Sequence, residues 1–590
     1  MAKVPKKTKA LPSMQSLNSF VKAICDVMRR SNCASALQYV PELTWILFLR
    51  ILDQHDTSER EAAEMVGRDF THALDAPYRW RDWAMPFDGK SLLADGRHPG
   101  WKRQELFDQG AGALFEFVNS SLLPHLRKLG LASQASPKQK IIGEIMSAVE
   151  RVRIDTESNF LDVLDMVNQI STEQIDTTHI FTLSQVYEDL LLKMGEKNSD
   201  GGQFFTPREV IRAMVKTVDP TLGERVYDPC CGTGGFLAQS YEHMLAGLGD
   251  AATGDQIEQL KHDTFFGREK ENLVFPIALA NLVLHGIDQP NLWHGNTLTE
   301  KETYGGLFEN APAYFDVLLT NPPFGGKEGK EAQDRFPFKT SSTQVLFVQH
   351  ILATLKQGGR CGIVLDEGLL FRTNEEAFVR TKRKLLDECN LWCVVSLPGG
   401  VFTAAGAGVK TNLFFFTKGE PTEKIWYYDL SGIKVGKKTP LTSAQFADYF
   451  EKLPTRANSE VSWTIDFIAR KQTASQQAAP HRKEEQQHKE KVFQLKEKLP
   501  ALKKNRSANA ARIEAIEADI TRLDKQAREA AAKAQAIEDA VYDLKAVNPS
   551  VKPDTDTRLP AEIIASIEKR GEEVTTALRK LKALGELEKA

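Results

Sequence analysis

The fold is decided by a short apolar strand that runs into a glycine-rich turn, Arg225-Val226-Tyr227-Asp228-Pro229-Cys230-Cys231-Gly232-Thr233-Gly234-Gly235-Phe236-Leu237. Asp228 stands at the carboxyl end of this strand, and a helix is expected after the turn. Glycines at such a turn allow the backbone to come close to a ligand. The turn lacks the Lys-Ser/Thr pair of a P-loop and does not match the dinucleotide pattern G-x-G-x-x-G. Asp228 therefore suits an amine or amide better than a phosphate.

The residues that follow predict an α/β sheet. We expect strands at residues 263–266, just before residue 295, and at 315–320, 361–365, 391–397 and 409–417, the last of these closing the series. Helices are expected at residues 209–217, 273–285, 343–355 and 374–387. This alternation is typical of a largely parallel, doubly wound sheet, in which ligands bind at the carboxyl ends of the strands. Four polar residues stand at such ends: Asp228, Glu269, Asn296 and Asn321. Glu269 is well placed to hold ribose hydroxyls, so these residues predict a nucleoside site.

The fourth strand runs into a rigid turn, Asn321-Pro322-Pro323-Phe324-Gly325. Alone this would be an ordinary strand-to-loop turn, because Asn-Pro is a common turn pair. Beside a nucleoside site it suits methylation of an amino group. The Asn321 side-chain oxygen and the Pro322 carbonyl can accept the amine hydrogens of adenine, and Phe324 can stack on the ring. The adenine must be flipped out of duplex DNA to reach such a turn. The reaction requires no metal and no covalent nucleophile.

Size and composition point to a soluble protein of three or four domains, with 590 residues, 42% of them hydrophobic and 26% charged. The net charge is only −3 despite 76 basic residues, so a partner is expected to supply much of any grip on DNA. The seven cysteines form no disulfide framework and no paired zinc pattern, which favours a reducing cytoplasm. The first ten residues are basic but precede no apolar segment, so a secretory signal is not expected.

The two ends of the chain are expected to be helical. Residues 17–128 and 138–194 contain amphipathic runs and no chemical motif. Near the C-terminus, apolar residues recur at alternating intervals of three and four, which is the pattern of a coiled coil. These residues are Ile513, Ile516, Ile520, Leu523, Ala527, Ala530, Ala534, Ile537, Val541 and Leu544. A second helix is expected at residues 560–584. The pattern fits an intermolecular coil and a hairpin within one chain equally well, and both are assembly elements.

Taken together, the motifs make the chain similar to the modification (methyltransferase) subunit of type I restriction-modification systems. The resemblance extends over nearly the full length. It rests on Gly202-Gln203-Phe204-Phe205-Thr206-Pro207-Arg208, Asp228-Pro229-Cys230-Cys231-Gly232-Thr233-Gly234-Gly235, Glu269, Leu284-His285-Gly286, Gly295-Asn296-Thr297-Leu298 and Asn321-Pro322-Pro323-Phe324-Gly325. The resemblance implies a Rossmann-like methyltransferase that moves a methyl group from S-adenosyl-L-methionine to the N6 atom of adenine in DNA.

The resemblance also assigns roles to individual residues. The cofactor would be held by the first two motifs, with Asp228 near its amino-acid end, by Glu269 at the ribose and by Asn296. The first two motifs contribute Gln203, Phe204, Phe205, Thr206, Pro207, Arg208, Gly232, Thr233, Gly234 and Gly235. The catalytic turn would be Asn321, Pro322, Pro323 and Phe324. Many amino-methyltransferases have aspartate where this chain has Asn296, and asparagine also occurs in the type I group.

The resemblance and the periodicity together predict the domain organisation. We expect a basic flexible tail (1–16), an α-helical N-terminal domain (17–195), a methyltransferase domain (196–420), a linking region (421–490) and a coiled-coil assembly region (491–590). No target-recognition domain follows the catalytic turn, so a separate specificity subunit, bound by two modification subunits, would choose the DNA sequence. A restriction subunit would join for cleavage, in the cytoplasm of a bacterium or archaeon.

Two alternatives stay open at this point. A protein glutamine methyltransferase also uses an Asn-Pro-Pro-aromatic turn, but that family usually has tyrosine at the position of Phe324 and a much smaller chain. A non-catalytic assembly subunit would keep the fold without the activity, and the intact Asn321, Pro322, Pro323 and Phe324 argue against it.

Overall fold

The structure is a computed structural model of the chain. It describes residues 14–65, 67, 69–170, 206–249, 252–287, 289–299, 306–308, 311–402, 410–436, 439–505, 508–545, 547–549 and 560–587. The chain divides into two compact units, residues 1–546 and 547–590. Of the expected cofactor residues, Gln203, Phe204 and Phe205 lie outside the described residues, as does the part of the expected second helical stretch beyond residue 170.

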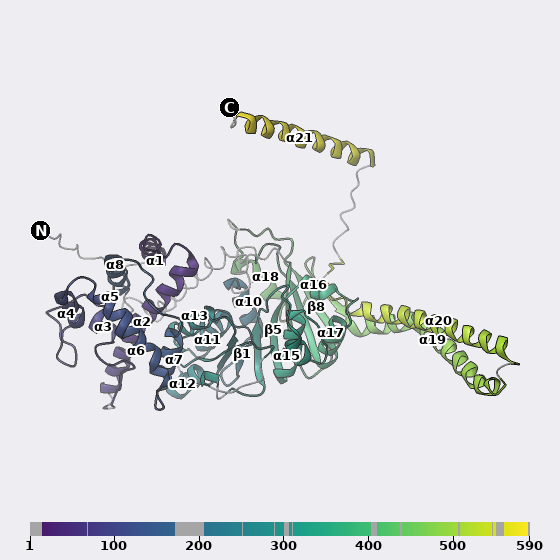
Figure 1. Cartoon of the computed structure of the whole chain (residues 1–590), viewed down its shortest axis with the longest axis horizontal. Helices are drawn as coiled ribbons and strands as arrows, with labels where there is room; N and C mark the ends of the chain where they lie inside the picture. Colours follow the sequence, from purple (N-terminus) through teal and green to yellow (C-terminus); the bar gives the residue numbers. More distant parts are fainter. Residues whose placement is uncertain are drawn as a thin grey trace. The chain divides into compact units, whose positions relative to one another are not determined.

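The N-terminal part of the first unit is helical, as expected (Figure 1). Its helices are α1 (Met14–Arg29), α2 (Ala36–Met65), α3 (Trp80–Trp83), α4 (Trp101–Gln109), α5 (Ala113–Phe117), α6 (Leu123–Lys128), α7 (Pro137–Met146) and α8 (Glu157–Asn168). A π-helical turn, η1 (Val118–Leu122), joins α5 to α6, and a 3-10 turn, η2 (Leu129–Leu131), follows α6.

Local sequence explains where these helices begin, and packing joins them to the rest of the unit. Helix α7 starts with a capping box, in which the Ser136 side chain accepts from Gln139 N and the Gln139 side chain accepts from Ser136 N. Trp45, Trp80 and Trp83 are fully buried and supply much of the core. Helices α2 and α7 pack against α13 (Val274–Leu284) of the sheet domain, so one hydrophobic core continues across both domains.

A nine-stranded sheet forms the centre of the second domain, in the order β3-β2-β1-β4-β5-β7-β6-β8-β9. The strands are β1 (Val226–Asp228), β2 (Phe265–Glu269), β3 (Asn291–His294), β4 (Phe315–Thr320), β5 (Leu355–Asp366), β6 (Cys389–Ser396), β7 (Thr411–Lys418), β8 (Lys424–Asp429) and β9 (Ser462–Asp466). Strand β7 runs antiparallel to β5 and β6, and β9 runs antiparallel to β8, while the other neighbours are parallel. The expected largely parallel α/β sheet is therefore confirmed.

Helices cover both faces of this sheet, which separates two hydrophobic cores. One face packs against α10 (Arg208–Val218), α11 (Gly235–Leu248) and α13, and the other against α15 (Thr343–Thr354) and α17 (Glu376–Glu388). Strand β7 illustrates the alternation, since Phe415 belongs to the first core and Phe414 and Phe416 to the second. The shorter helices are α12 (Gly254–His262), α14 (Lys330–Asp334), α16 (Glu367–Phe371) and α18 (Ala447–Lys452), with 3-10 turns η5 (Gly306–Phe308) and η6 (Ser443–Phe446).

Three expectations about the strands are corrected. Strand β2 is Phe265–Glu269, not residues 263–266, so Glu269 belongs to the strand and pairs with His294. Strand β5 is Leu355–Asp366, not residues 361–365, so it begins where the expected helix 343–355 ends. The strand at 409–417 is not the last, because β8 and β9 come from the expected linking region 421–490. The apolar run of β8 is buried between β6 and β9, which explains why this segment joins the sheet and does not form a linker.

The expectation of a linking region is also wrong for its C-terminal part, because the chain is helical there. Helix α19 (Phe467–Lys503) begins at the N-cap Asp466, whose side chain accepts from Ala469 N at 2.8 Å. Residues 467–490 of the expected linking region form most of this helix, and they are rich in Gln, Glu and Lys, which are good helix formers. Helix α20 (Ala510–Asp539) returns beside α19, so the hairpin alternative is the one found (Figure 1).

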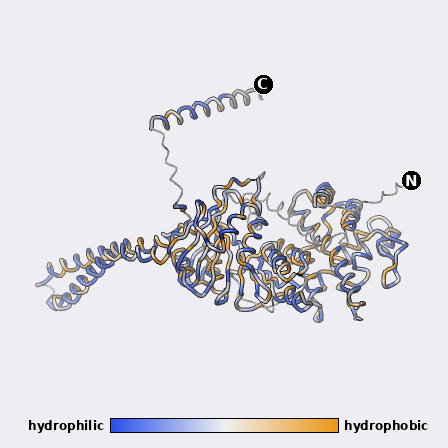
Figure 2. The backbone as a smooth tube through the Cα atoms, turned by 180° about the vertical axis from the view of Figure 1, so that it is seen from behind, coloured by the Kyte–Doolittle hydropathy of each residue, from blue (hydrophilic) through white to orange (hydrophobic). Residues whose placement is uncertain are grey.

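The seam of this hairpin uses the residues that the 3-4 spacing predicted. The buried ones on α20 are Ile513, Ile520, Leu523, Ala527, Ala530 and Ala534. Figure 2 shows hydrophilic residues along most of the hairpin, with hydrophobic positions between them. The base is fixed to the sheet domain through the 3-10 turn η7 (Ala540–Tyr542) and Leu544, whose carbonyl accepts from the Tyr427 hydroxyl at 3.3 Å. Val541, Tyr542 and Leu544 are buried in the second core.

The second unit contains helix α21 (Pro560–Leu587), close to the helix expected at residues 560–584. Among all described helices, none combines the length and the apolar composition that crossing a bilayer requires.

Candidate functional site

The site begins where the strand order reverses, between the parallel neighbours β1 and β4. Asp228 ends β1 and is buried, and its Oδ1 accepts from the Thr320 hydroxyl at 2.6 Å and from Cys230 N at 3.2 Å. Burial raises the pKa of Asp228 to about 7, although both hydrogen bonds oppose the shift, and the charge of Glu269 adds to it. A buried carboxyl at this switch point is well placed to bind a cationic or hydrogen-donating group.

The glycine turn after β1 has backbone dihedral angles that residues with a side chain adopt only with strain. Gly232 (φ +54°) and Gly234 (φ +81°) are left-handed, and Gly234 is the N-cap of α11. A Cβ on Gly234 would come within 3.2 Å of the Leu282 side chain. The turn is held from two sides, because Gly232 N donates to Glu269 Oε2 at 2.9 Å and the Asn281 amide donates to Thr233 O at 2.8 Å.

Glu269 at the end of β2 is brought to the same rim as Asp228. It is 7% exposed, and its Oε1 accepts from Glu271 N at 2.9 Å while Oε2 accepts from Gly232 N. Burial raises the pKa of Glu269 to about 7, against the effect of these backbone hydrogen bonds. The carboxyl group is thus held in a fixed position at the edge of a small cavity of about 50 Å³.

That cavity joins the residues expected to act together. It is lined by, among others, Gly232, Glu269, Asn296, Asn321, Pro323 and Phe347. Asn296 follows β3, and its Oδ1 accepts from Leu298 N at 2.9 Å, which shapes the turn there. Three of the four predicted rim residues, Glu269, Asn296 and Asn321, therefore line one cavity. The fourth, Asp228, is hydrogen-bonded to Cys230, which also lines it.

The nitrogen and the oxygen of the Asn321 side-chain amide differ in their hydrogen bonding. Its Nδ2 donates to the Thr206 hydroxyl at 3.0 Å, and its buried Oδ1 has no hydrogen-bond partner among the described residues. Thr206 comes just before α10, whose N-cap is Pro207 and whose first residue is Arg208. This hydrogen bond joins the first and the last of the predicted site motifs. A buried oxygen without a partner is costly, which is a reason to expect a hydrogen-donating ligand there.

Phe324 belongs to the same turn as Asn321. Its half-buried ring lies edge to face against Phe402, with the centroids 5.3 Å apart and an interplanar angle of 81°. Phe402 is 1% exposed and follows β6 by a Pro-Gly-Gly-containing turn. Pro322 is buried and Pro323 lines the cavity, so the two prolines are part of the site wall.

Sequence reasoning missed several residues that shape this site. Phe402 fixes Phe324, Thr320 holds Asp228, and Thr343 and Glu328 close a loop beside Asn321 through a 3.1 Å hydrogen bond. Thr320 could have been recognised as the last strand residue before Asn321. Phe402 had a comparable signal, a glycine-rich turn followed by an aromatic residue at a strand end. Glu328 and Thr343 carry no local signal, because a loop brings them together.

Comparison with known proteins agrees with this geometry. The N-6 DNA Methylase family matches residues 178–489, more than half of the chain, and the HsdM N-terminal domain matches residues 17–159. The chain therefore belongs to the N-6 DNA methylase family, in its group of type I restriction-modification methylase subunits. As a member it is an adenine-specific DNA methyltransferase with S-adenosyl-L-methionine as cofactor.

Individual relatives support the same assignment over most of the chain. The methylase subunit of the type I restriction enzyme EcoEI from Escherichia coli is 32% identical over 473 residues, covering 77% of this chain and 89% of that protein. A chain from a structure of type I restriction-modification complex assembly is 33% identical, with a TM-score of 0.63, over 98% of this chain and 100% of the other. A modification subunit of a putative type I enzyme from Vibrio vulnificus is 31% identical, with a TM-score of 0.63, over 78% and 94% of the two chains.

The residues present fit the cofactor of this family. Glu269 offers a fixed carboxyl group for ribose hydroxyls, and the left-handed glycines leave room for close approach of the backbone. Asn321, whose buried Oδ1 has no hydrogen-bond partner among the described residues, lines the same cavity as Glu269. Among the described residues there is no group of three or more metal-ligating side chains.

Proposed function

We propose that this chain transfers a methyl group from S-adenosyl-L-methionine to the exocyclic N6 atom of an adenine that has been flipped out of duplex DNA. The observation that carries the proposal is the state of Asn321, whose Nδ2 is held by Thr206 while its buried Oδ1 lacks a partner among the residues described. The Oδ1 atom is thus available as an acceptor for an amine hydrogen beside the cofactor cavity.

The chain's own groups can activate a weak nucleophile. The lone pair of the adenine amine is delocalised into the ring, so the nitrogen is planar and unreactive. Asn321 Oδ1 and the Pro322 carbonyl would accept its two hydrogens, which turns the nitrogen towards a tetrahedral geometry and frees the lone pair. When bound, the cofactor supplies an electrophilic methyl group on a sulfonium centre. As the new N6–methyl bond forms and the sulfonium–methyl bond breaks, the nitrogen loses its excess proton to solvent. Asn321 Oδ1 accepts a hydrogen bond from N6 and does not itself take up the proton.

The aromatic pair would hold the base. Phe324 stacks on the adenine ring, which is worth about 1–3 kcal/mol, and Phe402 fixes the orientation of the Phe324 ring. Alignment of amine and methyl group supplies most of the rate acceleration, because two bound reactants no longer need to meet and orient.

We further propose that the chain works within a type I complex. A specificity subunit, bound by two copies of this chain, would select the DNA sequence, and a restriction subunit would join for cleavage, so that methylation protects host DNA. A net charge of −3 on 590 residues supports a shared grip on DNA. The α19–α20 hairpin is the proposed docking element, and the cytoplasm of a bacterium or archaeon is the proposed location.

The test is methyl transfer from radiolabelled cofactor in a mixture that contains the chain, its specificity subunit and duplex DNA. Label is expected in N6-methyladenine after digestion of the DNA to nucleosides. Label found in protein alone would instead favour a glutamine methyltransferase, and no transfer while cofactor is bound would favour a non-catalytic subunit.

A further inference from the structure

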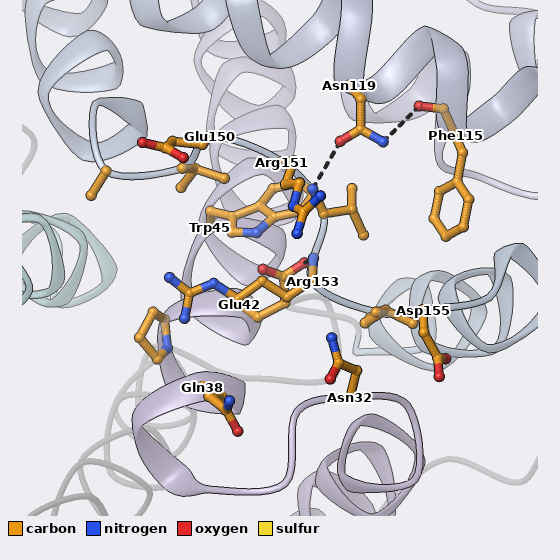
Figure 3. Close-up of a pocket in the computed structure, with 15 residues that line it drawn as sticks. Asn32, Gln38, Glu42, Trp45, Phe115, Asn119, Glu150, Arg151, Arg153 and Asp155 are labelled. Carbon is orange, nitrogen blue, oxygen red and sulfur yellow. Dashed lines mark hydrogen bonds between the residues drawn. The ribbon is translucent and has the colours of Figure 1, made fainter.

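A second cavity lies in the helical N-terminal domain, and neither the cofactor nor the methylated base accounts for it. Its volume is about 750 Å³, within the range of about 300–1,000 Å³ that is usual for ligand pockets. Four segments surround it: the turn between α1 and α2, the first half of α2, the α5–η1 junction, and residues 148–155 before α8. Figure 3 shows this pocket with its lining side chains.

The pocket wall is held by specific hydrogen bonds. Glu42 is 2% exposed and its Oε1 accepts from Arg153 N at 3.0 Å. Asn119 accepts from Val152 N at 2.9 Å and donates to Phe115 O at 2.9 Å (Figure 3). These bonds fix the extended segment that contains Arg151 and Arg153.

Two unfavourable backbone features occur at the same pocket. Asn119 lies in the π-helical turn η1, and Asn32 has a left-handed backbone with φ +65°. π-helical turns and strained residues are found preferentially at functional sites. Both features bring a polar side chain to the pocket wall, so they support a binding role for it.

The pocket presents two guanidinium groups on one side. Val152 and Ile154 are buried, while Arg151 and Arg153 alternate with them and are exposed. In an extended segment this alternation directs both arginines the same way. Within the described part of the chain neither arginine forms an ion pair. Figure 3 shows their side chains over Trp45 and Glu42, with Asn32 and Gln38 on the opposite side.

Three carboxyl groups also line the pocket, those of Glu42, Glu150 and Asp155, and burial raises the pKa of Glu42 to about 7. The two arginines and the amide side chains of the pocket are the groups that fit a nucleoside phosphate. Paired guanidinium groups bind phosphate oxygens with matching geometry. The Asn32 amide can form hydrogen bonds to a base or sugar, as can the Gln38 Nε2, while Gln38 Oε1 already accepts from Ser35 N at 3.1 Å. The half-buried ring of Phe115 offers an apolar face. A pocket of this volume admits one nucleotide and excludes a duplex.

We infer that the N-terminal pocket binds a single unpaired nucleotide through Arg151 and Arg153. This inference rests on the proposed DNA substrate, and it adds a nucleotide site outside the methyl-transfer site. The nucleotide comes either from a DNA strand or from a free nucleotide, because both carry the phosphate and the base that the pocket recognises.

The experiment measures binding of fluorescein-labelled, 5′-phosphorylated tetrathymidylate to the full chain by fluorescence anisotropy. The double variant Arg151→Ala/Arg153→Ala is expected to raise the dissociation constant at least tenfold. Its control is Lys128→Ala/Lys140→Ala, which removes the same charge from exposed positions of the same domain outside the pocket and should stay within about twofold. Arg151→Lys/Arg153→Lys should give an intermediate loss, since lysine keeps the charge but not the paired geometry. Thermal unfolding confirms that each variant is folded.

Competition identifies the source of the nucleotide. Displacement by thymidine 5′-monophosphate assigns the pocket to a free nucleotide, and displacement by the unlabelled tetranucleotide alone assigns it to a strand. The inference would be overturned if the arginine variant and the lysine control lost the same affinity for the probe. It would also be overturned if hexaglutamate displaced the probe as well as the unlabelled tetranucleotide does. The Asn321→Ala variant should bind the probe like the native chain, so failure of the methylation proposal is seen separately from failure of this one.

Discussion

The side-chain amide of Asn321 donates to the hydroxyl of Thr206 at 3.0 Å, and this bond determines which end of the amide is free to act. With Nδ2 engaged, the buried Oδ1 is the atom left without a described partner. Residues 115 positions apart are thereby joined at one site, one preceding α10 and one following β4. The orientation of the amide that we propose to be catalytic thus depends on a motif that we expected only to contact the cofactor.

Thr206→Val is expected to lower kcat for DNA methylation by about 3- to 10-fold, because it removes one hydrogen bond worth about 0.5–1.5 kcal/mol while preserving shape. The dissociation constant for S-adenosyl-L-methionine should change little. Steady-state kinetics combined with calorimetric cofactor titration separates the two quantities. Thr206→Ser, which retains the hydroxyl, should recover most of the rate. A Thr206→Val enzyme with native kcat would show that the hydrogen bond does not orient Asn321.

Phe402→Leu is expected to lower kcat/KM for DNA by about 2- to 10-fold. The substitution removes an edge-to-face contact worth about 0.5–1.5 kcal/mol and lets the Phe324 ring rotate. Phe416→Leu is the matched control, because Phe416 is equally buried but belongs to the core on the other face of the sheet. If both variants lose the same activity, the effect is one of general packing and not of base stacking.

Asp228→Asn tests the buried carboxyl through pH. The pKa of Asp228 is raised to about 7 in the folded chain, whereas an aspartate in an unfolded chain has a pKa of about 3.9. The folded protein therefore holds this proton more tightly, and the stability that it contributes is complete below about pH 4 and is lost as the pH rises through 7. Asparagine keeps an acceptor for Thr320 and Cys230 but does not titrate.

The free energy of unfolding of Asp228→Asn, relative to the native chain, should accordingly rise by about 2–3 kcal/mol between pH 5 and pH 8. Urea titrations of the cofactor-free protein at both pH values measure this difference. Asp263→Asn, which removes an exposed carboxylate near β2, is the control. A relative stability that is constant with pH would contradict the raised pKa.

Ala534→Leu tests the hairpin. Ala534 is fully buried in the seam between α20 and α19, so a larger side chain should separate the helices at a cost of about 1–3 kcal/mol. Co-purification with the specificity subunit is expected to weaken, while cofactor binding is retained. Ala532→Leu adds the same side chain at an exposed position of α20 and should leave assembly intact. Native assembly of the Ala534→Leu chain would argue against docking through this hairpin.

The sequence was informative wherever a strand end carries a polar residue. The positions of Asp228, Glu269, Asn296 and Asn321 could be predicted because parallel strands bring their carboxyl ends to one rim. The glycine turn and the start of helix α10 could also be placed, from the glycines of the turn and from the proline before the helix. What the spacing could not provide is the contact between Asn321 and Thr206, since it depends on how α10 packs against the sheet.

The prediction failed where local composition and tertiary packing disagree. The segment containing β8 and β9 lies between polar stretches and was taken for a linker, yet Tyr427 and Trp463 stack in the second core at a centroid distance of 5.5 Å. The polar sequence of α19 lacks a strong apolar stripe, because few of its positions are buried and two of these are alanines: Phe467, Ala474, Ala478 and Val492. The 3-4 pattern identified the seam of α20 but could not identify α19 as its partner.

The most direct test of the account is Asn321→Ala, assayed for N6-methyladenine formation in the complex with the specificity subunit. Removing the Oδ1 acceptor should lower kcat by about 100-fold or more, a loss comparable to that of one preorganised hydrogen-bonding group in other enzymes. Cofactor affinity and co-purification should remain close to native. A variant that forms N6-methyladenine at the native rate would contradict the central claim that Asn321 activates the adenine amine.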